Sequence, residues 1–188
     1  MTSKLPNAQT SIFAVMTGLA NEHDAINLAQ GFPDFDVAPE LIDRIHHYMQ
    51  KGLNQYAPMP GVPVLRQAIV DKIKSTYDTA ILPDEITVTA GATQALFTAI
   101  TALVKDGDEV IYFDPAYDSY LPVIQLSGGI PVSINLDKHD FSIPWHQVEQ
   151  NISDKTRLII INTPHNPSGA VLTADDIDRL EGLVKGKD

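Results

Sequence analysis

Apolar residues recur at helical spacing in three stretches near the start of the chain. These stretches cover residues 10–21, 39–49 and 65–77, and each places apolar side chains three and four positions apart. We therefore expect three helices, each with one apolar face. Residues 26–35 and 54–63 lack this spacing and are interrupted by glycine and proline, so we expect extended or looped backbone there.

From residue 85 onward the pattern changes to alternating strands and helices. The predicted strands cover residues 85–90, 109–113, 130–136 and 157–162, and the predicted helices cover 93–104, 119–126 and a segment that begins after Thr173. The last strand is an uninterrupted apolar run, which is typical of a strand covered on both faces. A Thr-x-x-Asp sequence at Thr173 resembles a capping box. Alternation of this kind predicts an α/β fold with a mainly parallel sheet and flanking helices.

The composition is that of a globular protein, with 188 residues of which 44% are hydrophobic and 20% charged. Cysteine is absent, which excludes disulfides and thiolate metal sites. A net charge of −11 argues against a nucleic-acid partner, because acidic surfaces repel a phosphate backbone. No apolar run reaches the roughly 18–20 residues of a membrane span, and no secretory segment is recognisable. We expect a cytoplasmic protein with no membrane partner.

A run of small residues joins the strand predicted at 85–90 to the helix that follows it. Gly91 and Ala92 allow a ligand to approach the helix N-terminus, where N–H groups lack partners within the helix and the dipole favours an anion. The Thr93 hydroxyl can donate to the same anion, so this turn is a candidate phosphate site. The alternative is a tight turn in which Thr93 serves only as a cap.

Two further motifs follow predicted strands, at the sheet edge where α/β proteins bind ligands. Tyr117 offers a ring that can stack on a flat aromatic ligand, or it is an ordinary tyrosine of the core or its rim. Asn166 stands between Pro164 and Pro167, which restrict the backbone. Its amide is either a fixed hydrogen-bonding group for a ligand or part of a structural turn. The six histidines show no metal-ligand spacing, so we expect no metal site.

Together and in order, these motifs resemble those of the class I/II aminotransferases, which are pyridoxal-phosphate enzymes of fold type I. The similarity is greatest to the bacterial methionine aminotransferases and the kynurenine aminotransferases, and it extends from about Ile26 to Gly169. The stretches that carry it are INLAQGFPDFD, NQYAPMPGVPVLRQAI, ITVTAGATQAL, DEVIYFDPAYDSY, LSGGIPV and LIIINTPHNPSG. The resemblance implies an aspartate aminotransferase-like fold and pyridoxal 5'-phosphate as cofactor.

The resemblance also implies a role for each cofactor-binding candidate. Gly91, Ala92 and Thr93 are expected to hold the cofactor phosphate, and Tyr117 is expected to stack on the pyridine ring. Asn166 is expected to bind the phenolic oxygen of the ring and to lie near the substrate carboxylate.

Three residues nearer the N-terminus receive substrate and partner roles from the same resemblance. Gly31 and Phe32 are expected to border the amino-acid substrate, together with Asn166. Tyr56 is expected to reach the cofactor phosphate of a neighbouring subunit, which implies a homodimer in the full-length form. Without the resemblance, the loops that hold these residues indicate only packing.

Family proteins have functional residues beyond the last matching motif of this chain. We expect residues 1–40 to form an arm and part of a small domain, and residues 41–188 to form the first half of the large cofactor-binding domain. The Schiff-base lysine, the carboxylate on the ring nitrogen and a carboxylate-binding arginine are all expected beyond Asp188. No catalytic residue is therefore assigned within the chain, and we expect the chain alone to be inactive.

The missing half also changes the expected sheet. The strand at 85–90 is expected to pair with late strands beyond Asp188, and the strand at 157–162 to be flanked by absent strands. The strands near 109–113 and 130–136 are then the one neighbouring pair expected within the chain. Edges and faces without partners would leave apolar side chains exposed.

The resemblance predicts transfer of the amino group of methionine, or of another large apolar or aromatic amino acid, to a 2-oxo acid. Two alternatives stay open at this point. One is a pyridoxal-phosphate C–S β-lyase acting on cysteine conjugates, because it uses the same cofactor and scaffold. The other is a non-catalytic fragment that retains a binding site or a dimer surface.

Overall fold

The computed structural model describes residues 3–6, 10–31 and 33–187. The chain divides into two compact units, and each is considered by itself. The sheet unit comprises residues 1–9 and 91–188, and the helical unit comprises residues 10–90. The predicted boundary between residues 1–40 and 41–188 concerns the domains of a longer fold and stays a prediction.

A parallel sheet of three strands forms the centre of the sheet unit. The strands are β1 (Glu109–Asp114), β2 (Ile130–Asn135) and β3 (Thr156–Ile159), and their order in the sheet is β2-β1-β3. β1 pairs with β2 without interruption from Glu109 opposite Ile130 to Asp114 opposite Asn135, and with β3 through a register shift next to Glu109. The prediction of an α/β fold with a parallel sheet is confirmed.

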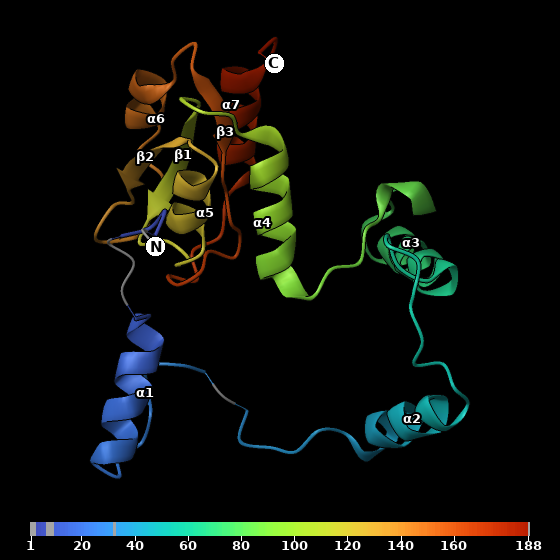
Figure 1. Cartoon of the computed structure of the whole chain (residues 1–188). Coiled ribbons are helices and arrows are strands. Elements are labelled where there is room, and N and C mark those ends of the chain that lie inside the picture. The colour runs from blue at the N-terminus through green and yellow to red at the C-terminus, as the bar shows by residue number, and fades with distance from the viewer. Residues whose placement is uncertain (1–2, 7–9, 32, 188) are drawn as a thin grey trace. The chain divides into compact units, whose positions relative to one another are not determined.

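Four helices cover the sheet on its two sides (Figure 1). They are α4 (Gly91–Leu103), α5 (Tyr120–Leu126), α6 (Trp145–Asn151) and α7 (Ala174–Val184). Successive side chains of β1 point to opposite faces, as in any strand. Val110 and Tyr112 pack with α4 and α5, whereas Ile111 and Phe113 pack with β2 and α6. β1 is therefore the element that joins the two apolar clusters.

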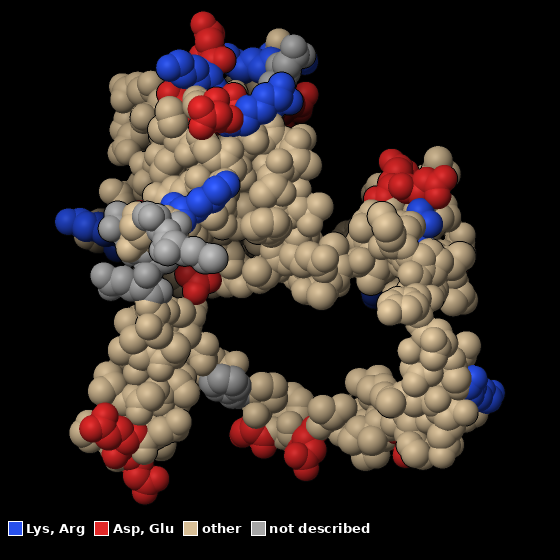
Figure 2. Space-filling model, viewed as in Figure 1, with Lys and Arg blue, Asp and Glu red and all other residues tan. Residues whose placement is uncertain are grey.

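The helical unit contains α1 (Ile12–Glu22), α2 (Pro39–Gln50), α3 (Pro63–Tyr77) and the short 3-10 helix η1 (Pro83–Glu85). The Ser11 hydroxyl caps α1 by accepting the Phe13 N–H, and prolines begin α2 and α3, where a missing N–H costs nothing. None of the described residues of these three helices is buried. On the face seen in Figure 2, uncharged side chains cover most of α1 and α2. Within the described ranges, no helix is long and apolar enough to cross a membrane.

Two strand predictions need correction. Residues 85–90 are not a strand, because η1 occupies Pro83–Glu85 and the extended backbone after it has no ladder partner among the described residues. The Val88 N–H instead donates to the Pro60 carbonyl at 2.9 Å. The expectation that residues 157–162 would lack a neighbour within the chain is also wrong. β3 pairs with β1, and the Ile160 N–H extends this pairing to the Ile111 carbonyl at 2.8 Å.

A buried tryptophan connects α6 to α7 across the second apolar cluster. Trp145 is 5% exposed, and its Nε1–H donates to Asp176 Oδ1 at 2.7 Å. Asp176 Oδ2 also accepts the Thr173 N–H at 2.8 Å, while the Thr173 hydroxyl accepts the Asp176 N–H, so the predicted capping box is confirmed. The Thr173 backbone N–H, the Thr173 hydroxyl and the Trp145 ring N–H lower the pKa of Asp176.

The Trp145–Asp176 bond leads to a stability prediction. Asp176→Ala removes the acceptor of the Thr173 N–H and leaves a buried ring N–H without its partner, so we expect the free energy of unfolding to fall by about 2 kcal/mol. Asp175→Ala is the matched control, since it removes an exposed carboxylate from the same first turn, and we expect less than about 0.5 kcal/mol. Urea unfolding followed by the fluorescence of Trp145, the single tryptophan, measures both. Equal losses in the two variants would contradict the assignment.

Candidate functional site

The N-terminus of α4 presents an open, exposed backbone. Gly91 has φ +80°, which favours glycine, and no described atom lies within 4 Å of the position that a Cβ would occupy there. Gly91, Ala92 and Thr93 are all exposed at the first turn of this 13-residue helix. The backbone at Gly91 is thus open on the side where a Cβ would stand, at the turn that carries the positive end of the helix dipole.

The ring of Tyr117 lies beside this helix end. Its hydroxyl is 3.0 Å from Thr93 Oγ1, although the two residues are 24 positions apart. Tyr117 meets Tyr120 edge to face, with ring centroids 5.8 Å apart and planes at 79°. Burial, followed by a coulombic interaction with Tyr117, raises the pKa of Tyr120. The structure thus brings together three of the residues predicted to hold the phosphate and the one predicted to stack on the ring.

Tyr117 remains accessible on one side. It lines an open hollow of about 720 Å³ together with Tyr112, Asp114 and Gln125. The ring is only partly buried, in contrast to Tyr120, which is 7% exposed. A flat ligand can therefore contact a ring whose orientation is already supported by a neighbour.

The loop after β3 carries Asn166 at the adjacent strand end. β1 and β3 are parallel neighbours, so the loops that follow them leave the same edge of the sheet, on the side where α4 begins (Figure 1). The Asn166 N–H donates to Asn162 Oδ1 at 2.7 Å, and Asn166 itself is exposed. The Leu172 N–H donates to Thr163 Oγ1 at 3.1 Å, which closes the base of the loop. Sequence reasoning singled out Asn166 and missed Asn162.

His165 holds the interior of the same loop. Its N–H donates to the Ala170 carbonyl at 2.8 Å, and its carbonyl accepts the Gly169 N–H at 2.7 Å. Its Nδ1 lies 2.8 Å from Ser168 Oγ. Burial lowers the pKa of His165, which favours the neutral ring at neutral pH. His165 therefore acts as a structural residue of the loop.

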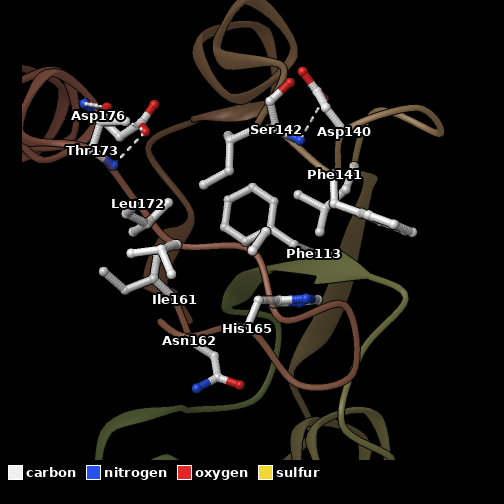
Figure 3. A pocket seen from close by; sticks show the side chains of 14 residues that line it. Phe113, Asp140, Phe141, Ser142, Ile161, Asn162, His165, Leu172, Thr173 and Asp176 are labelled. Carbon is white, nitrogen blue, oxygen red and sulfur yellow. Dashed lines mark hydrogen bonds between the residues drawn. The ribbon is translucent and has the colours of Figure 1, made fainter.

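The cavity next to His165 differs from the cluster around Tyr117. Figure 3 shows Phe113, Ile161 and Leu172 facing this space of about 220 Å³, while the Asn162 amide points away from it. Its acidic groups are already hydrogen-bonded, since the carboxylates of Asp140 and Asp176 accept backbone N–H groups. Of the described residues predicted to contact the cofactor, none lines this cavity. The cavity is an apolar space behind the loop.

The remaining predicted residues belong to the helical unit or lie outside the described ranges. Gly31 and Tyr56 are in the helical unit, and the Tyr56 side chain is fully exposed. Phe32 lies outside the described residues. The substrate role of Gly31 and Phe32 and the intersubunit role of Tyr56 stay predictions. Over the part of the chain that the structure describes, no three His, Asp or Glu side chains are placed to share a metal ion.

Comparison with known families identifies the class of protein. Residues 23–187 match the family model for aminotransferase class I and II, so the chain belongs to this family. Enzymes of this family depend on pyridoxal phosphate. The residues at the α4 N-terminus fit that group, because an open helix end with an adjacent hydroxyl suits a phosphate and a supported tyrosine ring suits a planar pyridine.

Individual relatives agree with the family assignment. The chain is 51% identical over 187 residues to methionine aminotransferase of Escherichia coli (strain K12), covering 98% of this chain and 48% of the relative. It is 39% identical over 185 residues to a probable N-succinyldiaminopimelate aminotransferase of Mycobacterium tuberculosis, covering 97% of this chain and 47% of that protein. The chain spans about half the length of the curated relatives it matches.

Solved structures show the same fold. A crystal structure of the Escherichia coli protein identified as having methionine aminotransferase function matches with a TM-score of 0.94 at 51% identity, covering 99% of this chain and 49% of the other. A Thermus thermophilus aspartate aminotransferase variant matches with a TM-score of 0.86 at 28% identity, covering 98% and 50% of the two chains. The predicted resemblance to class I/II aminotransferases and the predicted fold are confirmed.

Burial of His165 leads to a prediction about pH. The unfolded chain binds a proton at this ring with a pKa of about 6.5, whereas the folded chain has a lowered pKa. Between these values the unfolded state binds more protons, so stability is full above about pH 6.5 and is lost as the pH falls through the folded pKa. We expect the midpoint of urea unfolding to decrease as the pH is lowered from about 7.5 to about 5. His165→Gln should remove part of this decrease.

His146→Gln is the matched control for this measurement, because His146 is exposed on α6. The control variant should keep the wild-type pH dependence. A His165→Gln variant with the same slope as the wild type would show that burial of this ring does not couple to folding.

Proposed function

We propose that the protein is a pyridoxal-phosphate aminotransferase that moves the amino group of methionine, or of another large apolar or aromatic amino acid, to a 2-oxo acid. The observation that carries this proposal is the 51% identity, over 98% of the chain, to an enzyme named methionine aminotransferase. The chain accounts for about half of that enzyme's length. The activity is therefore proposed for the native gene product and not for residues 1–188 alone.

The α4 N-terminus is proposed to hold the cofactor phosphate. Backbone N–H groups at Gly91 and Ala92 and the Thr93 hydroxyl are the donors for its oxygens, and the open space at Gly91 supports this role. Hydrogen bonds to a charged phosphate are stronger than those to neutral groups. This arrangement explains why a small residue stands at each of the first two helical positions.

Tyr117 and Asn166 are proposed to bind the rest of the cofactor. Tyr117 offers the face of a ring that Tyr120 supports at its edge, and its position next to Thr93 suits a pyridine ring attached to the bound phosphate. Asn166 is proposed to donate its side-chain N–H to the phenolic oxygen and to face the substrate carboxylate. When bound, pyridoxal phosphate supplies an electron sink that allows an amino acid to lose its α-proton.

The remaining roles come from the family resemblance. The lysine that links to the cofactor is proposed to lie outside residues 1–188, because no lysine of this chain stands in a matching sequence context. Gly31 and Phe32 are proposed to border the substrate, and Tyr56 to reach the neighbouring subunit's phosphate in a homodimer. Residues 1–40 are proposed to contribute to the arm and small domain, and the protein to act in the cytoplasm.

An assay of amino-group transfer tests the activity. The native gene product should be purified from its source and its intact mass recorded, because the mass gives the length of the assayed protein. With added pyridoxal phosphate, we expect kcat/KM for methionine to exceed that for aspartate by about tenfold or more, because a pocket that accepts the methionine side chain would disfavour a charged one. Pyruvate and ammonia formed from a cysteine conjugate, without consumption of a 2-oxo acid, would favour the C–S β-lyase alternative. A protein that performs neither reaction would contradict the proposal.

Variants in the sheet unit test the cofactor site. Thr93→Val should raise the Kd for pyridoxal phosphate by about tenfold, since it removes a charge-assisted hydrogen bond. Thr101→Val should change it less than about twofold, because the Thr101 hydroxyl bonds the carbonyls of its own helix. Tyr117→Phe keeps the ring and should bind more tightly than Tyr117→Leu. Equilibrium titration followed by cofactor absorbance measures all four, and equal Kd values for the two threonine variants would contradict the phosphate assignment.

A further inference from the structure

A side-chain acceptor three residues after β3 holds the backbone of Asn166. Asn162 directly follows the apolar run Leu158–Ile161, and its Oδ1 accepts the Asn166 N–H at 2.7 Å. Asn162 is partly buried, whereas Asn166 is exposed. The bond therefore joins the sheet to the exposed part of the loop.

The chain offers few other ways to hold this turn. Pro164 and Pro167 have no N–H to donate, so only His165 and Asn166 can donate a backbone hydrogen bond between residues 164 and 167. The His165 N–H is taken by the Ala170 carbonyl, on the far side of the loop. The Asn166 N–H is the donor that connects back to the strand.

The segment between β3 and Asn162 is itself anchored to the sheet. The Ile160 N–H donates to the Ile111 carbonyl of β1 at 2.8 Å, two residues before Asn162. β1 is paired on both sides and buried on both faces. A continuous series of contacts thus runs from the central strand through Asn162 to the backbone of Asn166.

We infer that Asn162 is a positioning residue for Asn166. By holding the Asn166 N–H, Asn162 sets the direction from which the Asn166 side chain reaches the cofactor ring. The Asn162 amide points away from the cavity behind the loop (Figure 3). Asn162 does not itself contact the cofactor in this assignment. The inference rests on the proposed function, because the ligand of Asn166 is the pyridoxal phosphate assigned there.

The Asn162–Asn166 bond can be tested without cofactor. Hydrogen exchange at the Asn166 amide should accelerate by about tenfold in Asn162→Leu, which keeps the size of the side chain and removes the acceptor. Asn162→Asp keeps an acceptor at the same place and should retain wild-type protection at this amide. The control is Thr163→Val, next to Asn162. It removes the acceptor of the Leu172 N–H, which comes from the far end of the loop, and it should leave the Asn166 amide protected. Protection of this amide in Asn162→Leu would overturn the inference.

Cofactor affinity tests the functional part with a double-mutant cycle on the native gene product. Asn162→Leu should raise the Kd for pyridoxal phosphate by about fivefold to tenfold, and Thr163→Val by less than about twofold. If Asn162 acts through Asn166, adding Asn162→Leu to Asn166→Ala should not raise the Kd further. A second, additive loss would show a general effect on folding and would overturn the inference.

Two variants distinguish a wrong cofactor assignment for Asn166 from a wrong positioning role for Asn162. If Asn166→Ala binds pyridoxal phosphate as tightly as the wild type, the assignment of Asn166 as a cofactor contact is wrong, and the positioning role falls with it. If Asn166→Ala weakens binding and Asn162→Leu does not, the proposed function stands and only the positioning role is wrong. Thermal unfolding of each variant identifies any that fail to fold. If Asn162→Leu is among them, Asn162→Ala, which also removes the acceptor, replaces it and is expected to show the same rise in Kd relative to Thr163→Val.

Discussion

The pairing of β1 on both of its edges is the constraint on which the sheet unit depends. Its backbone hydrogen bonds are shared with β2 and β3, and its side chains alternate between the two apolar clusters. Val110 and Ile111 have no exposed surface at all. The six residues of β1 thus pair with both neighbouring strands and pack against the helices on both faces. The loops that follow β1 and β3 therefore begin from a rigid end of the sheet.

That edge explains how residues far apart in sequence can form one site. Tyr117 follows β1, Asn166 follows β3, and Thr93 begins the helix that packs on β1. Tyr117 lies three residues after β1 and Asn166 seven residues after β3, whereas Thr93 is held through the packing of α4 against β1, so the sheet limits the freedom of each segment. Local bonds reduce it further, since Tyr120 supports one ring and Asn162 holds one backbone N–H. Side chains that already occupy a fixed direction lose little entropy on binding a ligand.

Much of this arrangement follows from the sequence, and the exceptions have physical reasons. Periodicity is a local property, so it predicts α1–α5 and α7. The helix α6 between β2 and β3 was not predicted, because its seven residues are too few to show a helical period. A strand is defined by a partner, however, and the β-branched run at residues 85–90 forms no ladder with the described residues. The same dependence explains why the β1–β3 pairing was missed, since no local pattern records which strands are neighbours.

The candidate site also contains features that the sequence predicts and features that only the structure reveals. Gly91, Thr93 and Asn166 lie in motifs with a local signature, namely small residues before a helix and prolines on both sides of an amide. The bond between Trp145 and Asp176 joins residues 31 positions apart, and no pattern within a window indicates it. Asn162 is only four residues from Asn166, but an asparagine after a strand is common in turns, and only the geometry separates a turn from a support for a site residue.

Net charge and local electrostatics act in opposite directions at the proposed phosphate site. The chain carries a charge of −11, which repels an anionic cofactor at long range. At physiological ionic strength, however, exposed charges more than about 8 Å apart are largely screened, whereas the partial charges of helix N–H groups act at hydrogen-bond distance. A backbone-based site also needs no lysine or arginine of its own. An acidic protein can therefore bind a phosphate at α4, and the geometry of one helix end outweighs the composition of the whole chain.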